Sequence, residues 1–203
     1  MKTSPIKGCL FVLLTLTSSL LSAQDSKVDG TIEEVNQSPV EAKFASGGKV
    51  RMDLCPSAVE LIGRDDNRVR VSYFPEHDEN VKVRIDVFGD RADLRVSGCP
   101  HNNFQMTVEV PKSSDLYVRM FAGQMDLWGI TGDKDVEMYA GQLTMDVGDP
   151  KDYGQVTASV LSGDLEATAF NVSKGGLFRS FAQTGPGKYR LHAHVGAGQL
   201  EIR

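Results

Sequence analysis

Four histidines are the side chains in this sequence best suited to holding a metal, and two of them lie close together. His192 and His194 are two residues apart, so on a strand they project from one face, where such a pair could ligate a metal ion. Their neighbours Leu191, Ala193 and Val195 are apolar and belong to the opposite face, which places both imidazoles outside. The adjoining sequence offers no third ligand, so we expect two solvated histidines and no metal.

Carboxylates recur at one position of a glycine-centred repeat, and a pair of carboxylates can hydrolyse glycosidic bonds. The residues three positions after each glycine are Asp126, Thr144, Glu166 and Glu201. Outward positions on strands explain these acids without any catalytic role. The chain also lacks the GxSxG, HExxH, P-loop and Rossmann glycine motifs. We expect no catalytic residue and no cofactor; the alternative is a β-helix enzyme acting on polysaccharide, either a lyase or a hydrolase.

The first 23 residues have the order of a secretory signal peptide. Lys2 and Lys7 form a charged start, residues 9–21 are apolar, and Ser22 and Ala23 offer a small-residue cleavage site. The apolar run is shorter than the roughly 20 residues that span a membrane, and no later segment approaches that length. The sequence therefore predicts an exported protein, periplasmic, cell-surface or secreted, with no transmembrane segment after cleavage.

The charge balance excludes a generalised nucleic-acid binder. The chain has 22 Lys and Arg residues against 27 Asp and Glu residues, which gives a formal net charge of −5. A protein that binds along a phosphate backbone carries the opposite excess, so we expect no nucleic-acid partner.

Two cysteines share a sequence context that favours a disulfide. Cys55 and Cys99 each follow a strand-like run and precede a proline, in Leu54-Cys55-Pro56 and Gly98-Cys99-Pro100. Disulfides persist in exported proteins, and equivalent positions in stacked repeats lie close together. We predict a Cys55–Cys99 disulfide; the alternative is two buried free thiols. Their spacing is not that of a CxxC redox or zinc site.

The elements that must position these residues come from a repeat in the second half of the chain. Small or apolar residues stand five, three and one positions before a glycine, and again two and four positions after it. Such alternation is typical of half-buried strands, and its parity slips by one at the glycine. Each glycine is therefore predicted to be a structural corner between two strands, with a positive φ or a close backbone approach. The corner glycines are Gly123, Gly141, Gly163 and Gly198.

A repeat unit of about 20 residues with short strands and glycine corners predicts the coil of a β-solenoid. No segment outside the signal peptide has a sustained helical period, and the first half adds longer strands. These strands are expected at residues 49–54, 58–62, 69–73, 81–87, 92–96 and 104–110. We expect one all-β domain over residues 45–203, preceded by a signal peptide at 1–23 and a loose polar leader at 24–44.

Large apolar side chains stand at an outward position two residues before the corner glycines. Phe121, Tyr139 and Leu161 occupy it, and Tyr117 lies on the same strand face as Phe121. Exposed groups of this kind are candidates for a contact face that binds sugar rings or a partner protein. The alternative is that a loop or the N-terminal segment covers them.

The sequence ends inside the last repeat, and a terminal coil with an open apolar edge needs a cover. One expectation is a homo-oligomer in which another copy covers Leu200 and Ile202 of this coil. The competing expectation is that the long insertion between Gly163 and Gly198, which carries Phe178 and Phe181, covers the end within one chain.

Three stretches resemble a known family. They are the Val-Pro-Lys-Ser-Ser-Asp-Leu run at 110–116, the Ala-Gly-Gln or Ser-Gly-Asp corners, and the ending at residues 187–198. They look like the bacterial putative-adhesin domain family over residues 45–203, although three corners have Gln where that family more usually has Asp. The resemblance implies an exported, single-stranded, right-handed β-solenoid that is adhesin-like and not an enzyme. Its partner would be an envelope protein or a glycan.

Overall fold

The computed structural model describes residues 29–74, 80–100 and 103–203, and strands dominate them. This part of the chain contains two short 3-10 turns, η1 (Pro150–Asp152) and η2 (Thr168–Phe170), but no α-helix and so no helix able to cross a membrane. The predicted signal peptide at 1–23 lies outside the described residues. The strands are β1 (Gly30–Val35), β2 (Val40–Lys43), β3 (Lys49–Leu54), β4 (Ser57–Arg64), β5 (Arg68–Phe74), β6 (Lys82–Phe88), β7 (Arg91–Ser97), β8 (Gln105–Pro111), β9 (Asp115–Trp128), β10 (Lys134–Met145), β11 (Tyr153–Ala167), β12 (Val172–Thr184) and β13 (Tyr189–Ile202).

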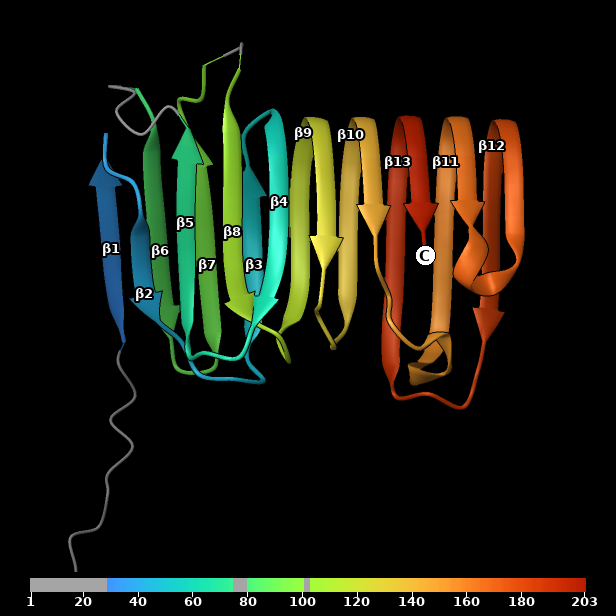
Figure 1. The fold of residues 1–203 in the computed structure, drawn as a ribbon, viewed down its shortest axis with the longest axis horizontal. Coiled ribbons are helices and arrows are strands. Elements are labelled where there is room, and N and C mark those ends of the chain that lie inside the picture. Colours follow the sequence, from blue (N-terminus) through green and yellow to red (C-terminus); the bar gives the residue numbers. More distant parts are fainter. Residues whose placement is uncertain (1–28, 75–79, 101–102) are drawn as a thin grey trace, which may run out of the picture.

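All thirteen strands belong to one mixed sheet that bends into two layers and does not close (Figure 1). The strand β9 shows how the layers are joined. Residues 115–120 pair in parallel with β3, and residues 123–128 pair in parallel with β4. The first layer therefore runs through β1, β6, β7 and β3, and the second through β2, β5, β8 and β4. The long strands β9, β10, β13 and β11 contribute one half to each layer.

The core lies between the two layers and follows the predicted alternation. In β9, Val118 and Met120 are buried before Gly123, while Met125 and Leu127 are buried after it. The inward positions thus change parity at the glycine, as the repeat predicts. Both halves of each long strand send their apolar residues to the same core because of this change.

The four corner glycines form a continuous column along one edge of the molecule. Parallel pairing places Gly123 beside Gly141, Gly141 beside Gly198, and Gly198 beside Gly163. Their φ angles lie between 125° and 139°, a region that residues with side chains rarely adopt. A Cβ on any of them would overlap the carbonyl oxygen of the preceding member, and on Gly123 that of Ser57. The column therefore requires glycine for both conformation and space.

The C-terminal strand does not lie at the end of the sheet. It is inserted between β10 and β11 and pairs with both in parallel (Figure 1). Leu200 and Ile202 are 0% exposed, because strands of the same chain flank them. The prediction that another copy covers these two residues is therefore wrong, and the strand order β10, β13, β11, β12 departs from the order in the chain. The all-β class is confirmed as a large open mixed sheet.

The last position in the sheet belongs to β12, which pairs antiparallel with β11 and bends at Gly176. Phe181 lies opposite the buried Ala158 and packs on Phe170, with ring centroids 5.8 Å apart. Lys174 Nζ and Arg179 Nε donate hydrogen bonds to backbone carbonyl oxygens of the same strand, at 2.7 and 2.6 Å. Charged side chains at a terminal strand disfavour further strand pairing. The insertion therefore forms the last strand of the sheet beside β11, and does not lie across the C-terminal strand as the competing expectation had it.

Two further strands form where a loose polar leader was expected. The strand β1 pairs antiparallel with β6, and β2 pairs antiparallel with β5. The expectation of a loose segment is wrong for these residues. The polar composition of this segment is explained by its place at the open edge, where Ile32, Val40 and Ala42, with Phe44 after β2, supply the apolar contacts to the core. The domain boundaries at residues 23 and 44 stay predictions.

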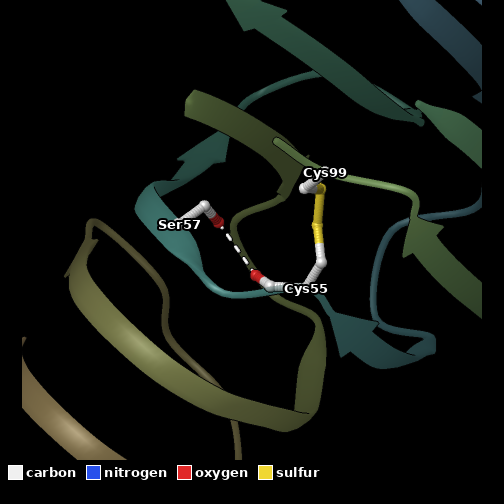
Figure 2. Close-up of a disulfide and its surroundings, with 3 residues drawn as sticks. All are labelled: Cys55, Ser57 and Cys99. Atoms are coloured by element: carbon white, nitrogen blue, oxygen red, sulfur yellow. Dashed lines mark hydrogen bonds between the residues drawn. A yellow bond between two sulfur atoms is a disulfide. The ribbon is translucent and has the colours of Figure 1, made fainter. Parts of the chain in front are cut away.

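Figure 2 shows the predicted Cys55–Cys99 disulfide, which is present. Its two Cα atoms are 6.1 Å apart, and the Ser57 hydroxyl donates a hydrogen bond to the Cys55 carbonyl oxygen at 2.9 Å. Cys55 lies in the connection from β3 to β4, and Cys99 in the connection from β7 to β8. The disulfide therefore links two neighbouring connections between the layers, on the edge where Ser57 begins the glycine column.

Replacing both cysteines by serine should destabilise the protein. The two residues are 44 positions apart, and a closed loop of this size contributes roughly 4 kcal/mol through the entropy of the unfolded chain. We expect denaturant unfolding of the Cys55→Ser, Cys99→Ser variant to show a loss of that order. The wild type treated with reductant should behave like the variant. Peptide mapping without reductant that recovers two free thiols would contradict the disulfide.

Gly141→Ala should be far more destabilising than alanine at a glycine with free space around it. The positive φ alone costs on the order of 1–3 kcal/mol, and the new Cβ would also overlap the Gly123 carbonyl oxygen. Gly148→Ala is the matched control, because Gly148 has a φ of 67° but no atom near its Cβ position. Thermal melts should show a clearly larger loss for Gly141→Ala; equal losses would show that the column does not restrict space.

Candidate binding face

The outer face of the first layer carries three rows of side chains that cross the strands. Register pairing aligns equivalent positions on neighbouring strands, which lie about 4.8 Å apart. The first polar row is Thr31, Asp86, Asp93, Arg51, Tyr117, Asp135, His192 and Thr157. The second polar row is Glu33, Arg84, Arg95, Asp53, Arg119, Glu137, His194 and Ser159. The apolar row contains Phe121, Tyr139 and Leu161, nearest the glycine column.

The apolar row is exposed in the described part of the chain. Phe121 and Tyr139 are 64% and 66% exposed, and Leu161 is 49% exposed. The first two rings stack, with centroids 5.0 Å apart and planes 7° from parallel. No described loop or strand covers them. Two adjacent strands thus hold a preformed aromatic pair in solvent.

Tyr117, the remaining member of the predicted contact face, has a different environment. The Arg119 guanidinium lies 3.7 Å from the centre of its ring, and the Arg51 guanidinium lies 5.0 Å from it. Both contacts are of the cation–π type. Tyr117 therefore holds two arginines in place on the outer face, and less of its ring is available to a ligand.

Arg119 is the centre of an ion-pair network on this face. Its guanidinium lies 3.1 Å from the Asp135 carboxylate and 3.0 Å from the Glu137 carboxylate. The nearby His192 Nε2 is 3.8 Å from Glu137, while its Nδ1 is hydrogen-bonded to the Thr157 hydroxyl at 3.0 Å. The network fixes the orientation of every charged group in it.

The same network contains a set of groups that could ligate a metal. Asp135, Glu137 and His192 each bring one ligand atom within 4.8 Å of the others. Arg119 already neutralises both carboxylates, so a metal ion would have to displace its guanidinium. As expected, His192 and His194 point outward, and His194 is hydrogen-bonded to the Ser159 hydroxyl at 2.8 Å.

The sequence did contain a signal for this third ligand. Asp135 stands six residues before Gly141, and His192 stands six residues before Gly198. Residues at the same distance from their glycines become neighbours once Gly141 and Gly198 are aligned. What the sequence did not show is that β13 pairs with β10, because the strand order departs from the chain order.

Two shallow depressions lie along the polar rows. One of about 550 Å³ covers β6, β7, β3 and β9, and another of about 260 Å³ covers β10, β13 and β11. Arg119 borders the first and its partner Asp135 borders the second. Within the larger one, hydrogen bonds from Arg84 and then Thr31 lower the pKa of the Asp86 carboxyl, so this acid stays charged.

Other surface features lie away from these rows. A depression of about 610 Å³ on the second layer is lined by Phe74 and Trp128 among other residues, but it contains no stacked aromatic pair. The residues three positions after each corner glycine, the acids Asp126, Glu166 and Glu201 and the buried Thr144, lie in the second halves of the long strands. The structure therefore separates those carboxylates from the outer face of the first layer.

One buried titratable group lies on the core side, beneath the smaller depression. Lys134 is 1% exposed; its ammonium donates a hydrogen bond to the Gly132 carbonyl oxygen at 3.3 Å and another to the Tyr153 hydroxyl. Burial lowers the pKa of Lys134 to about 8, although nearby aspartates, with Asp133 the foremost, oppose the shift. Burial likewise raises the pKa of Tyr153.

The stability of the protein should therefore rise between pH 8 and 9.5. In this window the unfolded chain keeps the Lys134 proton, since the ordinary pKa is 10.5, while the folded protein loses it. The full gain in the free energy of unfolding from this pKa difference is on the order of 3 kcal/mol. Above pH 10 the unfolded tyrosine ionises while folded Tyr153 stays protonated, which reverses the trend. Denaturant unfolding across this pH range measures the effect. Lys134→Met should remove most of the rise; a wild-type curve that is already flat would contradict the assignment.

Comparisons with known proteins give a distant structural likeness. No protein-family model and no curated protein matches the chain. The fold is similar to the crystal structure of a putative cell adhesion protein from Clostridium sporogenes ATCC 15579 at 1.95 Å resolution. The TM-score is 0.47 with 15% identity, over 81% of this chain and 98% of the other. A likeness this distant carries no function to this chain, and the resemblance to the putative-adhesin domain family rests on the corner motifs.

Proposed function

We propose that this protein is an exported, adhesin-like binding protein that presents the outer face of its first layer to a glycan at the cell envelope. In this proposal residues 115–203 form right-handed β-solenoid coils around the glycine column. The coils act as a rigid scaffold, and the protein is not an enzyme. The Cys55–Cys99 disulfide supports an oxidising location.

The observation that carries the proposal is the exposed aromatic pair beside two rows of charged and hydroxyl groups. Sugars present apolar C–H faces together with hydroxyl edges. Phe121 and Tyr139 offer the apolar contact, and the adjacent Arg119, Glu137 and His194 offer hydrogen-bonding groups. Because continuous strands hold these groups, little conformational entropy is lost on binding.

A binding role is favoured over catalysis by the state of the acids on this face. Asp135 and Glu137 are both paired with Arg119 and both partly exposed. A general acid for glycosidic cleavage must reach the glycosidic oxygen, whereas the Arg119 guanidinium holds both of these carboxylates. The polysaccharide-cleaving alternative would require this network to rearrange.

A glycan array followed by calorimetry on the glycans retained tests the proposal. We expect Phe121→Ala and Tyr139→Ala each to weaken binding at least about tenfold, which is ~1.4 kcal/mol. Phe74→Ala is the matched control, since Phe74 is also 64% exposed but lies on β5 in the second layer. An array that retains no glycan would contradict the proposal, and so would a loss confined to the Phe74 variant.

Incubation of the protein with polysaccharide, and affinity capture of its partners, distinguish the alternatives. Release of reducing ends or unsaturated products from a polysaccharide, abolished by Asp135→Asn or Glu137→Gln, would establish an enzyme. Affinity capture that depends on Phe121 and Tyr139 but retains only an envelope protein would replace the glycan by a protein partner.

A further inference from the structure

We propose that the ligand is an acidic, carboxylate-bearing linear polysaccharide, a polyuronate, which lies across the strands in the larger depression of the outer face. This inference rests on the proposed function and names the class of glycan. Three observations on the outer face carry it: the charge of the depression, the state of its arginines and the direction of its rows.

The lining of the larger depression contains more basic than acidic side chains, although the protein as a whole is negative. Five arginines and three aspartates line it, whereas the whole chain has a net charge of −5. An excess of guanidinium groups over carboxylates attracts anions and raises their local concentration. Guanidinium groups also bind carboxylates in a bidentate manner, which a hydroxyl group alone does not match.

Two of these arginines are available to a ligand. Arg84, Arg91 and Arg119 have close carboxylate partners, at 2.8, 2.6 and 3.0 Å respectively. Arg95 is only within 3.7 Å of Asp53, and its side chain is 70% exposed. Arg51 forms no ion pair with any residue that the structure describes, and it is held only by the Tyr117 ring.

The available arginines lie on neighbouring strands. Arg51 is opposite Asp93 in the pairing of β3 with β7, and Arg95 is two residues beyond Asp93 on the same face. They therefore present two cationic groups on adjacent strands, one in each polar row. Carboxylates of a sugar chain that covers both rows could contact the two arginines.

The direction of the rows matches an extended chain. Each row repeats once per strand, and strands are spaced at about 4.8 Å. An extended polysaccharide advances by a similar length for each sugar ring. The larger depression continues through the Arg119–Asp135 pair toward the smaller one, so the face can accommodate several consecutive sugars. Binding should therefore strengthen with chain length.

Calorimetry with defined oligosaccharides tests the inference. The probes are trigalacturonate, heptagalacturonate, neutral laminariheptaose and a heparin octasaccharide. We expect heptagalacturonate to bind at least tenfold more tightly than trigalacturonate and laminariheptaose, and to weaken with added salt. The Arg51→Gln, Arg95→Gln variant should lose at least tenfold in affinity for heptagalacturonate. Arg68→Gln, which removes an exposed arginine of the second layer, should lose none.

Each other outcome has a distinct meaning. Equal binding of heptagalacturonate and laminariheptaose, unchanged in the double variant, would overturn the acidic class and leave the proposed function intact. Heparin binding as tightly as heptagalacturonate would show that the face responds to charge density, which also overturns the carboxylate assignment. No binding of these probes by a protein whose array retains other glycans would overturn the inference alone. An array without any glycan would overturn the proposed function as well. Melting curves of the variants confirm that each is folded, since the altered side chains are at the surface.

Discussion

The constraint on which this structure depends is the passage of the chain from one layer to the other along a single edge. Neighbouring backbones there approach until the carbonyl oxygen of one strand occupies the place of a side chain on the next. Only glycine meets this condition, and the φ values of the column are themselves glycine values. The edge continues through Ser57 to the Cys55–Cys99 disulfide. There a covalent bond holds the β3–β4 and β7–β8 connections together.

The column also determines the surface chemistry. Once four glycines are aligned, every residue at an equal distance from them is aligned as well. This produces rows of side chains that cross the strands, with apolar groups near the edge and charged groups farther from it. Arg119 can pair with both Asp135 and Glu137 because the rows bring them together. The candidate binding face therefore follows from the same packing restriction that bends the sheet.

Much of this could be predicted from local sequence. The parity change at each glycine gave the bend, the alternation gave the buried residues, and the shared context of Cys55 and Cys99 gave the disulfide. The exposure of Phe121 and Tyr139 followed from the same alternation. These are properties that a short segment determines through period and sterics.

The order of the strands could not be predicted in this way. The four repeats are nearly interchangeable in pattern, so alternation does not specify which repeat lies beside which. In the structure β13 enters between β10 and β11, and β12 takes the last position in the sheet. Similarly, β1 and β2 bury too few apolar groups to give a strong strand pattern. They form because the edges of β6 and β5 provide backbone hydrogen-bond partners for them.

The insertion of β13 between β10 and β11 has a consequence for how the molecule is built. Strands β11 and β12 precede in the sequence the strand that joins them to β10, so the two parts of the sheet stay separate until β13 has been synthesised. The strands from β1 to β10 can pair with one another without β13, and β11 can form a hairpin with β12. Their union depends on contacts between residues distant in sequence, which form slowly. Completion of this sheet therefore requires β13, and its final step is the entry of this strand between β10 and β11.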